Sequence, residues 1–293
     1  MTRKPVGPLR PYSFLAEPER SRAGEIMPVN TIFLTNRECP WRCVMCDLWK
    51  NTLTETVPAG AIPEQIDYAL ARLPAARHIK LYNSGSFFDP RAIPPADYAP
   101  IAARLACYEH VIVESHPALV GELCLRFRDL LAGRLEVAMG LETVHPGVLP
   151  RLNKGMTLEQ FARAAEFLRS NDIDLRAFIL VKPPYMRDDE AVEWAQRSLD
   201  FAFECKASAA TLIPTRAGNG AMEALAFTPP AIAMLEASLS YGIALAKGRV
   251  FADLWDLRRF SACDACYDAR ADRLLQMNLQ QCILAPVECG ACG

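Results

Sequence analysis

The sequence predicts an α/β fold, a partial (β/α)6 TIM-like barrel followed by a small cysteine-rich C-terminal extension. Short apolar runs of strand length alternate with amphipathic helical patterns from residue 30 onward, as in a parallel sheet with right-handed helical crossovers. Six strand–helix units are too few for a closed eight-fold barrel, which favours an open, curved sheet. The 293 residues suffice for a large core that needs no disulfide bonds.

The six expected strands are rich in valine, isoleucine, leucine or phenylalanine, as strands covered on both faces are. The segment that precedes these strands contains four prolines between residues 5 and 18, which exclude a long helix there. We expect this segment to form an arm. The chain then divides into an N-terminal arm (1–28), a barrel core (29–227) and a helical, cysteine-rich extension (228–293). The strands are expected at residues 31–35, 78–82, 110–115, 135–142, 175–181 and 208–214.

Helix-start signals mark several of the stretches between the strands. Thr157 and Gln160 have the spacing of a capping box, in which each side chain accepts a hydrogen bond from the backbone of the other. Asp188 is expected to cap the next helix in the same way. A further helix is expected from residue 229 to 247, where Gly248 ends it.

Charge and hydropathy exclude several classes of protein. The 32 Lys and Arg side chains against 34 Asp and Glu leave a net charge of −2, so no global positive field holds nucleic acid. No apolar run approaches the roughly 18 residues that span a bilayer, and no secretory signal is recognisable, so no membrane association is expected. Eleven cysteines in such a chain predict a reducing, cytoplasmic location with metal-binding or catalytic thiols.

Three cysteines directly follow the first expected strand. Cys39, Cys43 and Cys46 have the spacing C-x3-C-x2-C, and thiolates this close on an irregular loop can converge on one iron–sulfur cluster. Three protein ligands on a four-iron cluster leave one iron open to an amino acid chelate. The alternatives are buried cysteines or a zinc knuckle without its fourth ligand, and no histidine precedes residue 78 to complete a local zinc site. The carboxyl end of a barrel strand, where such folds carry their chemistry, favours the cluster.

A second group of cysteines occupies the end of the chain. Paired C-x2-C motifs are typical of structural zinc and equally of iron–sulfur clusters, so the sequence leaves zinc and an auxiliary cluster open. The five thiols are one more than either site needs, and we expect four of them to bind the metal. They are Cys263, Cys266, Cys282, Cys289 and Cys292, while Cys107, Cys124 and Cys205 are expected to be core thiols.

The C-x3-C-x2-C loop followed by five further βα units resembles the radical S-adenosylmethionine (SAM) superfamily. Met45 stands where members of that superfamily usually carry an aromatic residue. The resemblance implies a [4Fe-4S] cluster on Cys39, Cys43 and Cys46 that reductively cleaves SAM to a 5′-deoxyadenosyl radical, which abstracts a hydrogen from the substrate. It also implies an electron donor such as flavodoxin or ferredoxin.

Motifs at the later strand ends agree with this resemblance. Ser84, Gly85 and Ser86 occupy the glycine-rich motif whose backbone carbonyls receive the methionyl ammonium of SAM. Glu142, in GLET, matches the position that contacts the nucleoside or methionyl part. The sequence also places two polar side chains, Ser115 and Lys182, at strand ends, where each is a weaker candidate for SAM binding.

Together, NSGSFFD, ESHP, GLET, the NKG turn and LVKPPY resemble the archaeosine-forming branch of the group with an Elongator-type or coproporphyrinogen-dehydrogenase-type core. This implies a lysine-bearing deazaguanine nucleoside in tRNA as the substrate. A radical SAM enzyme acting on a small metabolite or peptide, and a non-catalytic cysteine-rich metal or Fe–S protein, are the alternatives. Phosphate contacts would come from a local basic patch, for which the candidates are Arg3, Lys4, Arg10, Arg37, Arg42 and Lys50.

Overall fold

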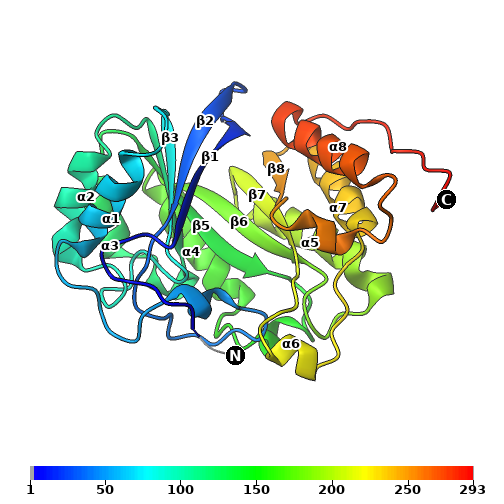
Figure 1. Ribbon diagram of the computed structural model, residues 1–293, viewed down its shortest axis with the longest axis horizontal. Coiled ribbons are helices and arrows are strands. Elements are labelled where there is room, and N and C mark those ends of the chain that lie inside the picture. Colours follow the sequence, from blue (N-terminus) through cyan, green and yellow to red (C-terminus); the bar gives the residue numbers. More distant parts are fainter. Residues whose placement is uncertain (1–2, 293) are drawn as a thin grey trace.

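The computed structural model describes residues 3–292, which contain one eight-stranded sheet with its strands in sequence order (Figure 1). The first two strands pair antiparallel, and all later neighbours are parallel. This is the partial barrel that the sequence predicts. The strands are β1 (Ser13–Arg20), β2 (Ile26–Phe33), β3 (His78–Tyr82), β4 (His110–Ser115), β5 (Arg134–Glu142), β6 (Asp174–Val181), β7 (Ala209–Pro214) and β8 (Arg249–Ala252).

Helices connect the parallel strands and cover the outer face of the sheet (Figure 1). The predicted capping box is present, because Thr157 Oγ1 accepts from Gln160 N at 3.2 Å and Gln160 Oε1 from Thr157 N at 2.9 Å. The helices are α1 (Ala61–Leu70), α2 (Tyr98–Arg104), α3 (Glu122–Arg128), α4 (Leu158–Ser170), α5 (Ala191–Glu204), α6 (Ala221–Ala224), α7 (Ile232–Ala244) and α8 (Tyr267–Gln280). Short 3-10 turns are η1 (Leu48–Asn51), η2 (Pro95–Asp97), η3 (Pro117–Leu119), η4 (Leu149–Leu152), η5 (Asp188–Glu190) and η6 (Leu257–Phe260).

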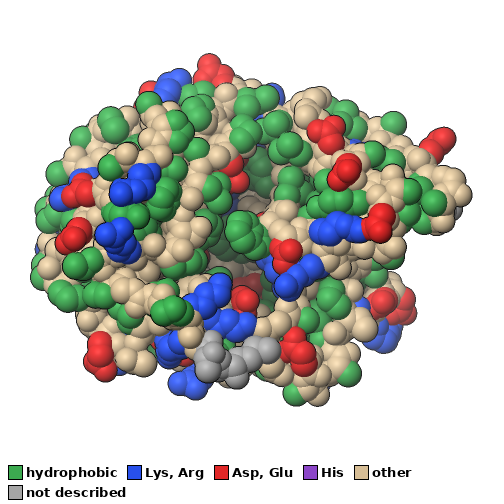
Figure 2. Space-filling view, in the orientation of Figure 1, with side chains coloured by type: hydrophobic (Ala, Val, Ile, Leu, Met, Phe, Trp, Pro, Cys, Tyr) green, Lys and Arg blue, Asp and Glu red, His purple; other side chains and the backbone are tan. Residues whose placement is uncertain are grey.

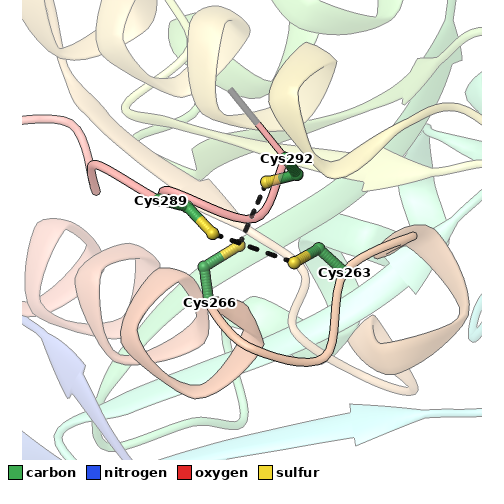
Figure 3. Close-up of side chains that lie close together, drawn as sticks. All are labelled: Cys263, Cys266, Cys289 and Cys292. Carbon is green, nitrogen blue, oxygen red and sulfur yellow. Dashed lines mark hydrogen bonds between the residues drawn. The ribbon is translucent and has the colours of Figure 1, made fainter.

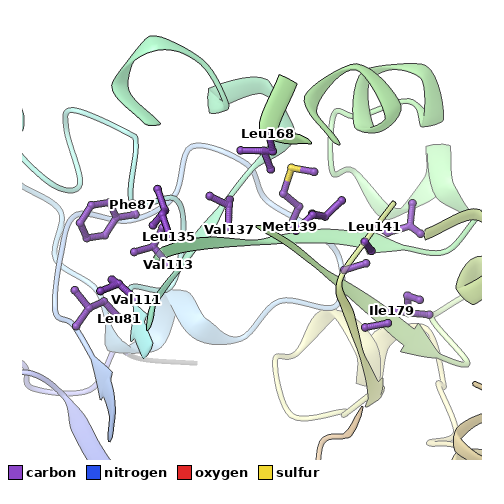
Figure 4. Close-up of a cluster of buried hydrophobic side chains, with 14 of the residues drawn as sticks. Leu81, Phe87, Val111, Val113, Leu135, Val137, Met139, Leu141, Leu168 and Ile179 are labelled. Carbon is purple, nitrogen blue, oxygen red and sulfur yellow. The ribbon is translucent and has the colours of Figure 1, made fainter. Parts of the chain in front are cut away.

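Alternation along each strand separates an apolar outer face from an inner face that carries polar groups. On β3, Lys80 and Tyr82 face the barrel interior, while Ile79 and Leu81 pack beneath the helices. The outer layer is continuous from strand to strand, as Figure 4 shows. Its members include Leu81, Phe87, Val111, Val113, Leu135, Val137, Met139, Leu141, Leu168 and Ile179, all fully or almost fully buried.

The curled sheet is closed by a helix and not by a strand pair. The Glu19 carboxylate of β1 accepts hydrogen bonds from the guanidinium of Arg176 on β6 at 2.7 and 3.1 Å across the interior. Helix α8 packs on both edge strands, β1 and β8. It is fixed to β1 by Arg20, whose Nη1 donates to Leu279 O at 3.2 Å. The open side of the barrel is therefore covered by the C-terminal extension.

The structure differs from the sequence prediction at both ends of the sheet. Strand β1 lies within the segment 1–28 expected to be an arm, and β8 lies within the extension 228–293, so both segments belong to the sheet of the barrel core. Asp188 does not cap α5 but lies in η5, and the Arg187 backbone N–H is capped by Glu190 Oε1 at 3.0 Å. Among residues 3–292, no helix combines the length and apolarity needed to cross a membrane.

Candidate functional site

A cavity of about 1390 Å³ opens at the carboxyl ends of the strands. In Figure 2 the molecule is hollowed near its centre, with lysine and arginine side chains gathered below the hollow. Cys39, Cys43 and Cys46, on the loop after β2, all line the cavity. Burial raises the pKa of Cys39 and Cys43 to about 11 and that of Cys46 to about 12. Without a metal these thiols therefore keep their protons at neutral pH, and a metal ion would displace the protons on binding.

The N-terminal segment braces this cysteine loop from outside. Lys4 N donates to Lys50 O at 2.8 Å, and the Arg3 guanidinium pairs with Glu38 and donates to Thr52 Oγ1 at 2.9 Å. Arg3 and Lys4 therefore lie beside the cysteine loop, where the basic patch was predicted.

The loop between β5 and α4 braces the cysteine loop from inside. Val44 N donates to Leu152 O at 3.0 Å, and Asn153 Nδ2 donates to Arg42 O at 2.8 Å. Gly155 has a φ of +67°, and a Cβ there would lie 3.1 Å from the Trp41 ring, so a glycine fits both the turn and the close approach. The NKG turn, residues 153–155, therefore helps to hold the cysteine loop in place.

His116, after β4, stacks on Trp41 with ring centroids 3.7 Å apart and an interplanar angle of 11°. Its Nε2 donates to Lys154 O at 3.0 Å, and its Nδ1 accepts from Ala118 N at 3.1 Å. Burial and the Lys154 charge lower its pKa to about 4. It is the one histidine among the described cavity-lining residues, and both its nitrogens are occupied. The three thiols therefore have no histidine available as a fourth ligand.

The predicted turn after β3 lies against the cysteine loop. Ser84 has a φ of +54°, and a Cβ added to Gly85 would lie 3.4 Å from Cys39 Cβ. Ser86 does not line the cavity; its Oγ lies 2.9 Å from Ser115 Oγ, which does. The turn is held by Glu114, whose Oε1 accepts from Asn83 N at 2.5 Å and Gly85 N at 3.5 Å.

Glu114 is a site residue that the sequence analysis did not single out. Burial raises its pKa, although the backbone N–H groups of the turn oppose that change. The available signal was a carboxylate next to the end of an otherwise apolar strand.

Glu142, at the end of β5, lines the cavity in a left-handed conformation with a φ of +64°. Its Oε1 accepts from Lys154 Nζ at 2.7 Å, and both side chains are 10% exposed. Burial opposes the Lys154 charge, but Glu142 outweighs it, and the pKa of Lys154 is raised. A Cβ at Gly140 would lie 2.5 Å from Lys154 Nζ and even closer to Glu142 Oε1. Glycine at 140 therefore leaves room for a buried ion pair, of which sequence reasoning found only the acid.

Lys182 directly follows β6, as the sequence predicts. Its φ is +53°, and its side chain is directed to the segment after β7, where Nζ donates to Thr228 O at 2.7 Å and Oγ1 at 2.8 Å and pairs with Asp188. It does not line the cavity. The side chain holds two loops together outside the cavity lining that the structure describes.

An ionic network forms the cavity floor and its support. Arg176 joins Glu19 and Glu136, and Lys80 Nζ lies 2.7 Å from Glu19 Oε2. Burial disfavours these charges, yet Arg176 lowers the pKa of Glu136 to about 2 and holds that of Glu19 well below its usual range. Each buried charge in this network is thus paired with an opposite charge, which offsets the cost of removing it from water.

The C-terminal cysteines form a second group, remote from the first in sequence. Cys263, Cys266, Cys289 and Cys292 bring their sulfur atoms within 4.8 Å of one another (Figure 3). The fifth candidate, Cys282, is exposed, and its thiol donates to Gln280 Oε1 at 3.4 Å. The structure thus selects four of the five predicted ligands.

Comparison with solved structures places this geometry in a known fold. A crystal structure of methylornithine synthase matches 74% of this chain and 64% of its own chain, with a TM-score of 0.52 and 14% sequence identity. The chain shares the α/β partial-barrel fold of methylornithine synthase. In this fold the loop that carries Cys39, Cys43 and Cys46 follows the carboxyl end of β2.

Sequence comparison finds further relatives, whereas no protein-family model matches. An uncharacterised protein of Methanocaldococcus jannaschii is 27% identical over 207 residues, covering 66% of this chain and 57% of the relative. The archaeosine synthase subunit beta of Methanosarcina acetivorans is 26% identical over 187 residues, covering 59% and 53%. The chain therefore spans about half the length of the curated relatives that it matches.

Proposed function

We propose that this chain is a radical SAM enzyme in which Cys39, Cys43 and Cys46 hold a [4Fe-4S] cluster. The observation that carries the proposal is a donor set of three thiols on one loop, lining a large cavity whose histidine is already engaged. Three thiolates suit a four-iron cluster with one open iron better than a four-ligand zinc site. When bound, the cluster supplies the electron that cleaves SAM and yields a 5′-deoxyadenosyl radical.

The surrounding residues have distinct roles in this proposal. The Ser84–Ser86 turn, held by Glu114 against Cys39, presents its backbone to the methionyl ammonium of SAM. Glu142 contacts the methionyl or nucleoside part with the oxygen that Lys154 leaves free. Lys154 balances negative charge beside Cys39 and Cys43.

The cavity volume supports the presence of SAM together with a second molecule. Pockets for single small ligands measure about 300–1,000 Å³, and this cavity is larger. Electrons would come from a small donor protein such as flavodoxin or ferredoxin.

The test of this proposal is SAM cleavage by anaerobically reconstituted protein in the presence of a strong reductant. Wild-type protein should hold four irons and form 5′-deoxyadenosine, whereas Cys39→Ala/Cys43→Ala/Cys46→Ala should do neither. Cys107→Ala is the matched control and should behave as the wild type, because Cys107 is exposed and not the core thiol that the sequence predicted. Equal product from the triple variant would reject the cluster assignment.

For the substrate, we propose a modified nucleoside in RNA, with tRNA as the RNA class. The naming of relatives as archaeosine synthase subunit beta supports this choice, and the word subunit suggests a second polypeptide as partner. Lys4 and Arg10 line the cavity near its mouth, and Arg42 on the cysteine loop is exposed. Such cations suit phosphates that flank a nucleoside entering the cavity.

The RNA proposal is tested by the salt dependence of tRNA binding. The test variant is Lys4→Ala/Arg10→Ala, because both residues precede β1, whereas deletion of residues 1–22 would remove β1 from the sheet. This variant should lower the slope of log affinity against log salt by about one per lost phosphate contact. Lys206→Ala/Lys247→Ala, which changes two exposed lysines lining a separate pocket, is the control. Absence of salt-sensitive binding, with an unchanged tRNA nucleoside profile in a deletion strain, would favour the small-metabolite alternative.

A further inference from the structure

The four C-terminal thiols are arranged around one point. Cys263 Sγ lies 3.9 Å from Cys289 Sγ, and Cys266 Sγ lies 3.8 Å from Cys292 Sγ, with the sulfurs directed toward one another (Figure 3). Four sulfurs about 2.3 Å from a single Zn²⁺ at tetrahedral angles lie about 3.8 Å apart. The observed spacing is therefore that of a single-ion site.

Two other uses of these thiols fit the geometry poorly. A cuboidal cluster binds each thiolate to a different iron, with sulfide ions between the irons, and so holds the cysteine sulfurs farther apart than one ion does. A disulfide needs sulfurs about 2.05 Å apart, and all four cysteines are free.

The site joins two segments that are separated in the sequence by helix α8. Cys266 is the N-cap of α8, whereas Cys289 and Cys292 lie at the end of the chain. Between them the chain runs back along α8, where the Arg273 guanidinium donates to Leu284 O and Ala285 O at 2.8 Å. An ion here would close the return segment onto the first turn of the helix.

Helix α8 is also a wall of the cavity. Leu275, Asn278 and Leu279 line it, and the Asn278 amide is bonded to Ala252 N at 2.8 Å and Ala252 O at 2.9 Å on β8. The C-terminal half of α8 is thus attached to the sheet by side-chain hydrogen bonds, whereas its N-terminal end meets the cysteine group.

We propose that Cys263, Cys266, Cys289 and Cys292 bind one tetrahedral Zn²⁺, and that this ion is structural. It fastens the end of the chain to the start of the helix that closes the barrel. It carries no electrons, because Zn²⁺ has no redox chemistry. The inference is independent of the radical cluster, and the test is designed accordingly.

The test uses the full chain carrying Cys39→Ala/Cys43→Ala/Cys46→Ala, so that iron of the proposed radical cluster is absent. Metal analysis should find one zinc and no iron per chain. Addition of Cys289→Ser/Cys292→Ser should remove the zinc, whereas Cys282→Ser, which changes the neighbouring exposed thiol, should keep it. Replacement of the zinc by Co²⁺ should give the visible ligand-field bands of a tetrahedral thiolate site.

Hydrogen exchange tests the structural role. Loss of zinc should speed exchange in the return segment and the first turn of α8 but leave the β8-bound half protected. Four irons retained in the first background and lost with Cys289→Ser/Cys292→Ser would overturn the single-ion assignment in favour of a cluster. Iron in place of zinc, or no metal at all, would also overturn it. Unchanged exchange after zinc removal would overturn the structural role.

Discussion

Replacing Lys154 by methionine should expose the cost of the buried ion pair beneath the cysteines. The Lys154 ammonium lies 2.7 Å from Glu142 Oε1, and each side chain is 10% exposed. Removing one partner of a fully buried pair costs about 3–5 kcal/mol, because the other charge is left without compensation. Since this pair borders a cavity that admits water, we expect a loss of about 2–4 kcal/mol in the free energy of unfolding.

Urea unfolding of the iron-free protein, followed by circular dichroism, measures that loss. Glu142→Gln added to Lys154→Met removes the stranded charge and should recover about 1–2 kcal/mol. The control is Lys247→Met, which changes an exposed lysine and should stay within about 0.5 kcal/mol of the wild type. The reasoning is refuted if Lys154→Met costs no more than the control, or if the double variant is less stable than Lys154→Met alone.

Three further predictions follow from the same cavity. Glu142→Ala should weaken SAM binding roughly ten- to hundred-fold in calorimetry while the cluster remains, and wild-type affinity would show that Glu142 is structural. Gly140→Ala should separate Glu142 from Lys154 and lower both stability, by about 1–3 kcal/mol, and SAM affinity; Gly121→Ala, where nothing lies within 4 Å of the added Cβ, should change neither. His116 has a pKa of about 4 in the folded protein, whereas in the unfolded chain it takes up a proton near pH 6.5. The free energy of unfolding should therefore fall as the pH falls from about 6.5 to about 4. His116→Gln should remove this part of the pH dependence, and an unchanged pH profile in that variant would contradict the prediction.

The sequence predicted the strands whose apolar residues alternate with the cavity-lining ones, but not the edges of the sheet. Strand β1 reads SFLAEPER, and its inward Glu17 and Glu19 are stabilised by Lys80 and Arg176, which lie far away in the sequence. Strand β8 has four residues, too few for a periodic signal. Both edges are specified by tertiary contacts and not by local propensity.

The same distinction holds at the site. The cysteine loop and the Ser84–Ser86 turn are continuous motifs, and the structure places the three cysteines, Ser84 and Gly85, but not Ser86, in the cavity wall. Lys154 and Glu114 were missed because each acts through a partner on another segment. Lys182 lies at the predicted strand end, but its amine turns to Thr228 and Asp188, because position at a strand end does not fix the direction of a long side chain.

The most direct measurement of the central claim is electron–nuclear double resonance of the reduced protein with isotopically labelled SAM. Because Cys39, Cys43 and Cys46 leave one iron of the proposed cluster open, ¹⁵N in the amino group and ¹⁷O in the carboxylate of the methionyl part should both couple strongly to the cluster spin. Absence of both couplings from protein that holds four irons and binds SAM would contradict the claim.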